Sequence, residues 1–139
     1  MNIAFFLLPK KEVVTLLTRS TVRQALEKME YHRYSTVPLV DDDGKYVGVL
    51  TEGDLLWKLK SLGDYRFQDT ENIKLTEIDR YQDYNPVAIY DEVQNILSKA
   101  IDQNFVPVTD DQGVFIGIVR RREILEFYAE SASKVKNQI

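Results

Sequence analysis

Residues 37–50 read VPLVDDDGKYVGVL, and residues 106–119 read VPVTDDQGVFIGIV. The second stretch follows the first by 69 residues and matches it without gaps. Each copy is a short apolar run, an acidic turn closed by glycine, and a second apolar run, which is typical of a β-hairpin whose glycine supplies a positive φ. Because an internal repeat decides architecture, the sequence predicts two copies of one structural unit.

The segments around each hairpin repeat as well. Apolar residues recur at helical spacing after each hairpin, over residues 52–60 and 121–130. A second helix precedes each hairpin, with Ser20 and Asp91 as the expected N-caps. Short β-rich runs, Val13 to Leu17 and Val87 to Tyr90, come before those helices. Each half therefore reads strand, helix, strand, strand, helix, an α/β (α+β) unit whose helices cover one side of a sheet.

The remaining segments set the expected domain boundaries. An apolar run, Ile3 to Leu8, stands before the first repeat, and a polar and aromatic segment with apolar residues at 73, 75 and 78 stands before the second. We expect both to be helical lead-ins. The predicted organisation is an N-terminal helix plus first repeat over 1–62, a linker with a short helix over 63–85, the second repeat over 86–132 and a tail over 133–139.

Composition narrows the class of protein. The 139 residues are 44% hydrophobic and 29% charged with a net charge of -4, which is typical of a soluble globular domain. The sequence has no basic stripe of the kind that binds nucleic acid, so we do not expect nucleic acid as a partner. The chain has no cysteine, and its first apolar run is too short for a signal peptide or a membrane span. We expect a cytoplasmic protein that binds no membrane.

The stretch Gly48-Val49-Leu50-Thr51-Glu52-Gly53-Asp54 resembles the Gly-h-h-Thr/Ser-x-x-Asp signature of the cystathionine-β-synthase (CBS) domain family, in which h is apolar. Two such domains in tandem are called a Bateman module. The resemblance implies two β-α-β-β-α repeats related by a pseudo-two-fold axis and packed through their sheets. It also implies a homodimer, and adenosine-containing ligands bound in two clefts between the repeats.

The signature residues have a chemistry of their own. A carboxylate such as Asp54 accepts hydrogen bonds from both ribose hydroxyls, and a hydroxyl such as Thr51 at a helix N-terminus donates to a phosphate that the helix dipole attracts. The alternative is that Thr51 only caps its helix.

The second copy departs from the signature. It has Arg120, Arg121 and Arg122 at the start of the helix and Glu123 in the place of aspartate. Cations at a helix N-terminus are unfavourable without an anion, and the guanidinium fork suits phosphate oxygens, so this end is predicted to bind a polyphosphate or phosphodiester. The alternative is pairing with acidic neighbours such as Glu126, or exposure to water.

The resemblance extends the candidate sites to residues before the proline of the opposite repeat. One site would combine Val49, Thr51 and Asp54 with Gln103 and Asn104. The other would combine Ile118, Arg120, Arg121, Arg122 and Glu123 with Tyr34 and Ser35. Val14 and Asn85, which precede the first helix of each repeat, would line the clefts.

Few other residues suggest a site. His32 is the only histidine, so a transition-metal site is not expected, and the aspartates at 41–43 lack calcium-loop spacing and read as a turn. Trp57 is predicted to lie in the core or at a dimer surface. No sequence motif for a nucleophile, phosphate loop or metalloprotease is present, so we expect neither an enzyme nor a catalytic cofactor.

The leading hypothesis is therefore a regulator that binds an adenine nucleotide and controls a partner protein of unknown identity. AMP, ADP, ATP, S-adenosylmethionine and cyclic di-AMP remain open as ligands. Cyclic di-AMP is included because some stand-alone tandems of this family bind it, and these resemble this chain in having an arginine pair after the second hairpin. The first alternative is a structural dimerisation module without a ligand, and the second is a small enzyme acting on a nucleotide.

Overall fold

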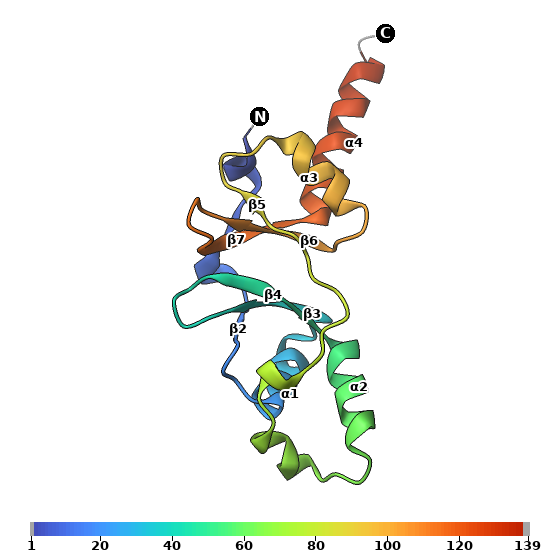
Figure 1. Cartoon of the computed structure of the whole chain (residues 1–139). Helices are drawn as coiled ribbons and strands as arrows, with labels where there is room; N and C mark the ends of the chain where they lie inside the picture. The colour runs from blue at the N-terminus through green and yellow to red at the C-terminus, as the bar shows by residue number, and fades with distance from the viewer. Residues whose placement is uncertain (1, 138–139) are drawn as a thin grey trace. The chain divides into compact units, whose positions relative to one another are not determined.

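The computed structural model describes residues 2–137, with side chains up to Val135. The chain divides into two compact units, residues 14–84 and residues 2–13 together with 85–137. The predicted mixed α/β class is confirmed, with two sheets and four α-helices in the described part of the chain (Figure 1). Within these residues every helix is too short or too polar to span a bilayer.

The first unit carries the first repeat. Its sheet has the order β2-β3-β4, with β2 parallel to β3 and β4 antiparallel to it. Its elements are β2 (Leu16–Leu17), α1 (Val22–His32), β3 (Thr36–Val40), β4 (Tyr46–Thr51), α2 (Glu52–Leu62), and the 3₁₀ turns η3 (Phe67–Asn72) and η4 (Leu75–Glu77).

The second unit repeats this arrangement and adds a strand. Its sheet has the order β1-β7-β6-β5, in which β5 is parallel to β6 and the β6–β7 hairpin corresponds to β3–β4. Its elements are η1 (Ile3–Phe6), β1 (Leu8–Pro9), η2 (Lys10–Glu12), β5 (Val87–Ala88), α3 (Val93–Ala100), β6 (Phe105–Thr109), β7 (Phe115–Arg120) and α4 (Arg121–Asn137). Both hairpins have a register shift at equivalent positions, Leu39/Val40 and Val108/Thr109.

The acidic stretches form the predicted turns. Asp41 Oδ1 accepts the N–H groups of Asp43 and Lys45, both at 2.9 Å, and Gly44 has φ 81°. The second turn repeats this geometry around Asp110, with Gly113 at φ 83°. Glycine is required at both places because other residues rarely adopt this φ.

Each unit has its own apolar core. In the first unit Val22, Ala25 and Met29 of α1 pack with sheet residues and with Leu55 of α2. Leu75 and Ile78 from the linker complete that core. In the second unit Ile96 and Ala100 of α3 pack with Val106, Val108 and Val119 of the sheet, with Ile124 of α4 and with Ile3.

Both predicted N-caps of the first helices were one residue early. Thr21, and not Ser20, caps α1: its Oγ1 accepts from Gln24 N–H at 3.2 Å, and the Gln24 side chain accepts from Thr21 N–H at 2.9 Å. Glu92 stands at the N-cap of α3, because the Asp91 side chain instead accepts the Ala88 N–H at 3.2 Å in the preceding turn.

The helical lead-ins were also predicted incorrectly. Residues 3–6 form a 3₁₀ turn, and Leu8 and Pro9 then pair with Ile118 and Gly117 of β7, so residues 2–13 pack in the same compact unit as the second repeat. The apolar run is too short for a stable helix and finds its partner in a sheet edge. In the linker the expected short helix is replaced by η3 and η4, and α4 continues to Asn137 through most of the predicted tail; residues 138–139 lie outside the described part.

Equivalent glycines permit a close crossing in both repeats. A Cβ on Gly117 would overlap the Leu8 carbonyl oxygen and lie 2.8 Å from Leu7 Cδ1. A Cβ on Gly48, the same position of the first repeat, would overlap the Arg80 guanidinium and the Asp83 carboxylate. Each repeat therefore has another segment of its unit lying against its second hairpin strand.

We predict that Gly117→Ala destabilises the protein, because the new methyl group meets main-chain atoms of β1 that cannot rotate away. The expected loss is about 1–3 kcal/mol of the free energy of unfolding, measured by chemical denaturation. Gly53→Ala is the control, since a Cβ there has its nearest neighbours at 3.7 and 3.8 Å. In a helix this change should stabilise by roughly 0.5–1 kcal/mol; equal effects of the two substitutions would contradict the crossing.

Candidate functional site

The signature residues Thr51 and Asp54 form a capping box at the junction of β4 and α2. Thr51 Oγ1 accepts the Asp54 N–H at 3.1 Å, and Asp54 Oδ2 accepts the Thr51 N–H at 3.0 Å. The arrangement satisfies two N–H groups that the helix start leaves unpaired. Asp54 is only 3% exposed, which is unusual for a carboxylate.

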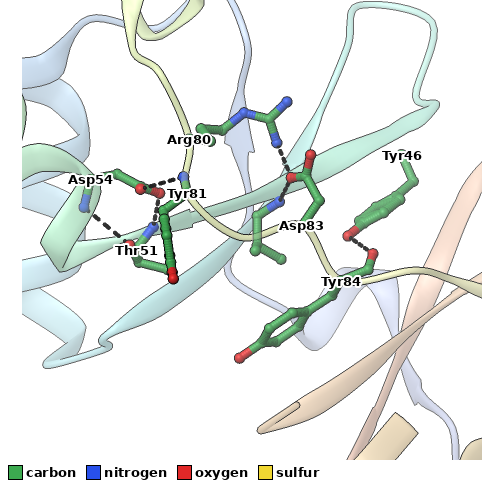
Figure 2. Close-up of polar contacts among 8 residues, drawn as sticks. Tyr46, Thr51, Asp54, Arg80, Tyr81, Asp83 and Tyr84 are labelled. Carbon is green, nitrogen blue, oxygen red and sulfur yellow. Dashed lines mark hydrogen bonds and ion pairs between the residues drawn. The ribbon is translucent and has the colours of Figure 1, made fainter. Parts of the chain in front are cut away.

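A linker residue occupies the other oxygen of this carboxylate. Asp54 Oδ1 accepts the main-chain N–H of Tyr81 at 3.0 Å (Figure 2). The Tyr81 side chain itself is 89% exposed. Asp54 therefore joins the signature to the linker through the linker's backbone.

Residues 80–84, which we call the strap, lie against β4 (Figure 2). Arg80 forms an ion pair with Asp83, and Asp83 Oδ1 also accepts the Val49 N–H at 3.4 Å. The Tyr46 hydroxyl donates to the Tyr84 carbonyl oxygen. Burial, with the nearby Asp83 charge adding to it, raises the pKa of Tyr46 well above its ordinary value, so the phenol stays protonated as a donor.

The equivalent helix start in the second repeat has no capping box. Arg120 instead forms an ion pair with Glu123 through its side chain. Arg122 Nε donates to Glu126 Oε1 at 2.9 Å, and this hydrogen bond raises the pKa of the Arg122 guanidinium. The anions that these cations need are thus supplied by the same helix.

Arg121 has a structural partner of a different kind. Its Nε donates to the carbonyl oxygens of Ala100 and Gln103, at 2.6 and 2.9 Å. Those carbonyls lie at the end of α3, where the helix leaves acceptors unpaired and its dipole favours a cation. Arg121 therefore fastens the start of α4 to the end of α3.

The residues before each proline stand beside the helix start of their own repeat. Glu52 N–H donates to Ser35 O at 2.9 Å, and Arg121 N–H donates to Asn104 O at 3.0 Å. The Tyr34 ring is 49% exposed and stacks on His32, with 5.4 Å between ring centroids. The Gln103 side chain donates to the Phe105 carbonyl at 3.3 Å.

The predicted site residues therefore fall into two clusters, one per unit. The first-unit cluster consists of Val14, Tyr34, Ser35, Val49, Thr51 and Asp54. The second-unit cluster consists of Asn85, Gln103, Asn104, Ile118, Arg120, Arg121, Arg122 and Glu123. In the first cluster Val14 packs against the apolar core, and in the second Ile118 pairs with Leu8 in the sheet, so these two side chains support the fold directly.

Sequence reasoning missed Arg80, Tyr81 and Asp83. The polar linker gave no motif for them. The usable signal was a glycine at the same position of both hairpins, since such a repeated glycine indicates that something approaches the backbone closely.

Comparison with known proteins adds the family. The sequence profile of the CBS domain matches residues 7–61 and 82–130. A CBS domain-containing protein of Dictyostelium discoideum is 26% identical over 137 residues, which are 94% of this chain and 94% of that protein. Inosine-5'-monophosphate dehydrogenase of Methanocaldococcus jannaschii is 26% identical over 134 residues, 93% of this chain but 25% of the enzyme.

Solved structures share the fold. A crystal structure of CbpB in complex with c-di-AMP superposes with a TM-score of 0.84 at 21% identity, covering 100% of this chain and 91% of that one. CbpB of Listeria monocytogenes, also in complex with c-di-AMP, gives a TM-score of 0.81 at 21% identity, covering 94% and 97%. At this identity the likeness establishes the fold.

We predict that Arg121→Ala lowers stability, because two carbonyls at the end of α3 lose a charged donor. The expected cost is about 1.5–3 kcal/mol, measured as the free energy of unfolding. Arg122→Ala is the control on the same helix, and its exposed pair should leave the unfolding midpoint unchanged. An unfolding midpoint that is the same for Arg121→Ala and wild type would show that the contact between Arg121 and α3 does not stabilise the protein.

Proposed function

The chain belongs to the CBS domain family, and on that premise we propose that it is a regulatory adenine-nucleotide-binding pair that controls a partner protein. Binding would favour one conformation of the pair over another, and the partner would respond to that conformation.

The observation that carries the proposal is the Thr51–Asp54 pair at the start of α2. A carboxylate has two oxygens with two acceptor directions each, so Asp54 can accept from the Thr51 N–H and still accept from both ribose hydroxyls. The first turn of a helix presents N–H groups and a positive dipole end, which favour phosphate. Ribose and phosphate contacts together identify a nucleotide.

The likeness to CbpB supports cyclic di-AMP as the first ligand to test, because two of the similar structures are complexes with it. ATP, ADP and AMP share the adenosine that the first cluster would recognise. In the second cluster the side chains of Arg120 and Arg122 are 53% and 87% exposed, so they are the cations that can change partner from carboxylate to phosphate. The Arg121 side chain is bonded to carbonyl oxygens at the end of α3 and is not available to a ligand. We therefore infer that the two clusters bind nucleotide with unequal affinity.

We infer that the protein acts by binding and not by catalysis. The match to the dehydrogenase covers a quarter of that enzyme, which is compatible with a shared regulatory part. The single histidine, His32 at the end of α1, stacks on Tyr34 and meets Tyr31 edge to face, away from the signature in the sequence.

A structural dimerisation module is the second candidate. It is favoured by the intrachain partners of Asp54, Arg121 and Glu123, which leave the signature satisfied without a ligand. Leu56 and Trp57 of α2 are 56% and 61% exposed, so Trp57 is not a core residue, and these side chains are available to a second copy. Under our proposal the same surface serves a homodimer that also binds nucleotide.

A panel of cyclic di-AMP, ATP, ADP, AMP and S-adenosylmethionine in thermal unfolding tests the proposal. A ligand at a hundredfold excess over its Kd should add about 2.7 kcal/mol to the native state, which raises the midpoint by several degrees. GTP and cyclic di-GMP are the matched controls for the base. A midpoint that none of the adenine ligands raises would leave the structural module as the function; ligand hydrolysis over hours would identify an enzyme.

We predict that Asp54→Asn weakens nucleotide binding by tenfold or more, because a charged acceptor for ribose is lost, which is worth about 1.5–3 kcal/mol. Isothermal titration calorimetry measures this change. Arg19→Ala, at an exposed pair with Asp42 in the same repeat, should bind as wild type does. An unchanged Kd in Asp54→Asn would move the ligand away from the first cluster.

A further inference from the structure

We propose that the strap, residues 80–84, is a gate over Asp54, and that a nucleotide binds the first cluster only when the Tyr81 N–H has left the carboxylate. The inference rests on the proposed function and adds its regulation. Asp54, the carboxylate of the signature, is 3% exposed, yet a ribose must come within hydrogen-bond distance of it to bind.

The strap is the linker segment that contacts Asp54 directly. Tyr81 N–H donates to Asp54 Oδ1 at 3.0 Å, and Thr51 N–H, at the end of β4, donates to Oδ2 at 3.0 Å (Figure 2). Because Asp54 is 3% exposed, a ribose reaches the remaining acceptor directions only after a covering segment moves, and the strap is the segment that contacts the carboxylate. A ribose with its two neighbouring hydroxyls needs both oxygens, so the strap has to lift.

The middle of the strap can move away from β4 because the linker is anchored on both sides of it. Ile78 and Tyr84 are 7% and 6% exposed and anchor the linker on either side. Between them Tyr81 and Asp83 are exposed. No apolar side chain holds this middle section, so its attachment consists of the Tyr81 hydrogen bond and the contacts that Asp83 makes with Arg80 and Val49.

Gly48 places the ion pair against the strand. A Cβ there would overlap both the Arg80 guanidinium and the Asp83 carboxylate, so the pair fills the space that a side chain would take. At the equivalent Gly117 the space is filled by the main chain of Leu8, which pairs with β7. In the second repeat the crossing segment is held by pairing between β1 and β7. In the first repeat it is held by the side chains of Arg80 and Asp83, which can separate.

Strap closure and nucleotide binding at Asp54 are then alternatives. The apparent affinity equals the intrinsic affinity multiplied by the fraction of molecules with the strap open. Binding in turn releases residues 80–83 of the strap, which the ligand-free protein keeps on β4. This release is a conformational difference that a partner can read.

The test uses the full chain with Arg80→Met and Asp83→Asn, which break the ion pair while the asparagine keeps an acceptor for Val49 N–H. Arg19→Met, which breaks the Arg19–Asp42 pair of the same repeat, is the matched control. The measurements are the Kd for cyclic di-AMP and for ATP, and the hydrogen-exchange rate of the Tyr81 amide by NMR. Trypsin cleavage after Arg80 in wild type and Asp83→Asn gives an independent measure of strap release.

We expect both strap variants to bind at least threefold more tightly than wild type and Arg19→Met, and to exchange the Tyr81 amide faster without ligand. In wild type, ligand should speed that exchange and the cleavage. Equal or weaker binding by the variants, or ligand protection of the Tyr81 amide, would overturn the gate while leaving nucleotide binding in place. If neither wild type nor variants bind either nucleotide, the proposed function fails and the gate fails with it.

Discussion

The structure depends on one constraint, the close crossing of an extended segment over the second hairpin strand of each repeat. A sheet edge has main-chain groups that need a partner, and the glycines at 48 and 117 let that partner approach. In the second unit the crossing segment becomes β1 and enlarges the sheet. In the first unit it is the strap, whose backbone also reaches Asp54. The linkers are therefore structural parts of the repeats as well as connections between them.

The repeat made most of the fold predictable. Hairpins, turns and the order of helices follow from residues 37–50 and 106–119, because alternating apolar runs and turn glycines are local signals. The lead-ins were not predictable in the same way. Whether Ile3 to Leu8 becomes a helix or a strand depends on the free edge of β7, and this partner lies more than a hundred residues along the chain. N-cap positions differed by one residue because Thr21 is as suitable a cap as Ser20, and because the Asp91 side chain accepts from Ala88 N–H in the preceding turn.

The candidate site shows a similar division. Residue type and spacing located Thr51 and Asp54, and their capping geometry is as the sequence suggests. The three arginines in a row left two interpretations open, an anion site or pairing within the protein, and the structure shows that Glu123, Glu126 and the end of α3 provide acceptors. Such partners depend on side-chain direction and on helix packing, which spacing alone does not encode. Only exposure separates the arginines available to a ligand from the one that holds α3.

The two crossings are made of different chemistry, and this difference has a physical consequence. Strand pairing between β1 and β7 uses neutral main-chain groups, which dissolved ions hardly affect. Arg80 and Asp83, with side chains 21% and 52% exposed, interact through charges that counterions screen. Added salt should therefore weaken the crossing in the first repeat, whereas the crossing in the second repeat should be unaffected by salt.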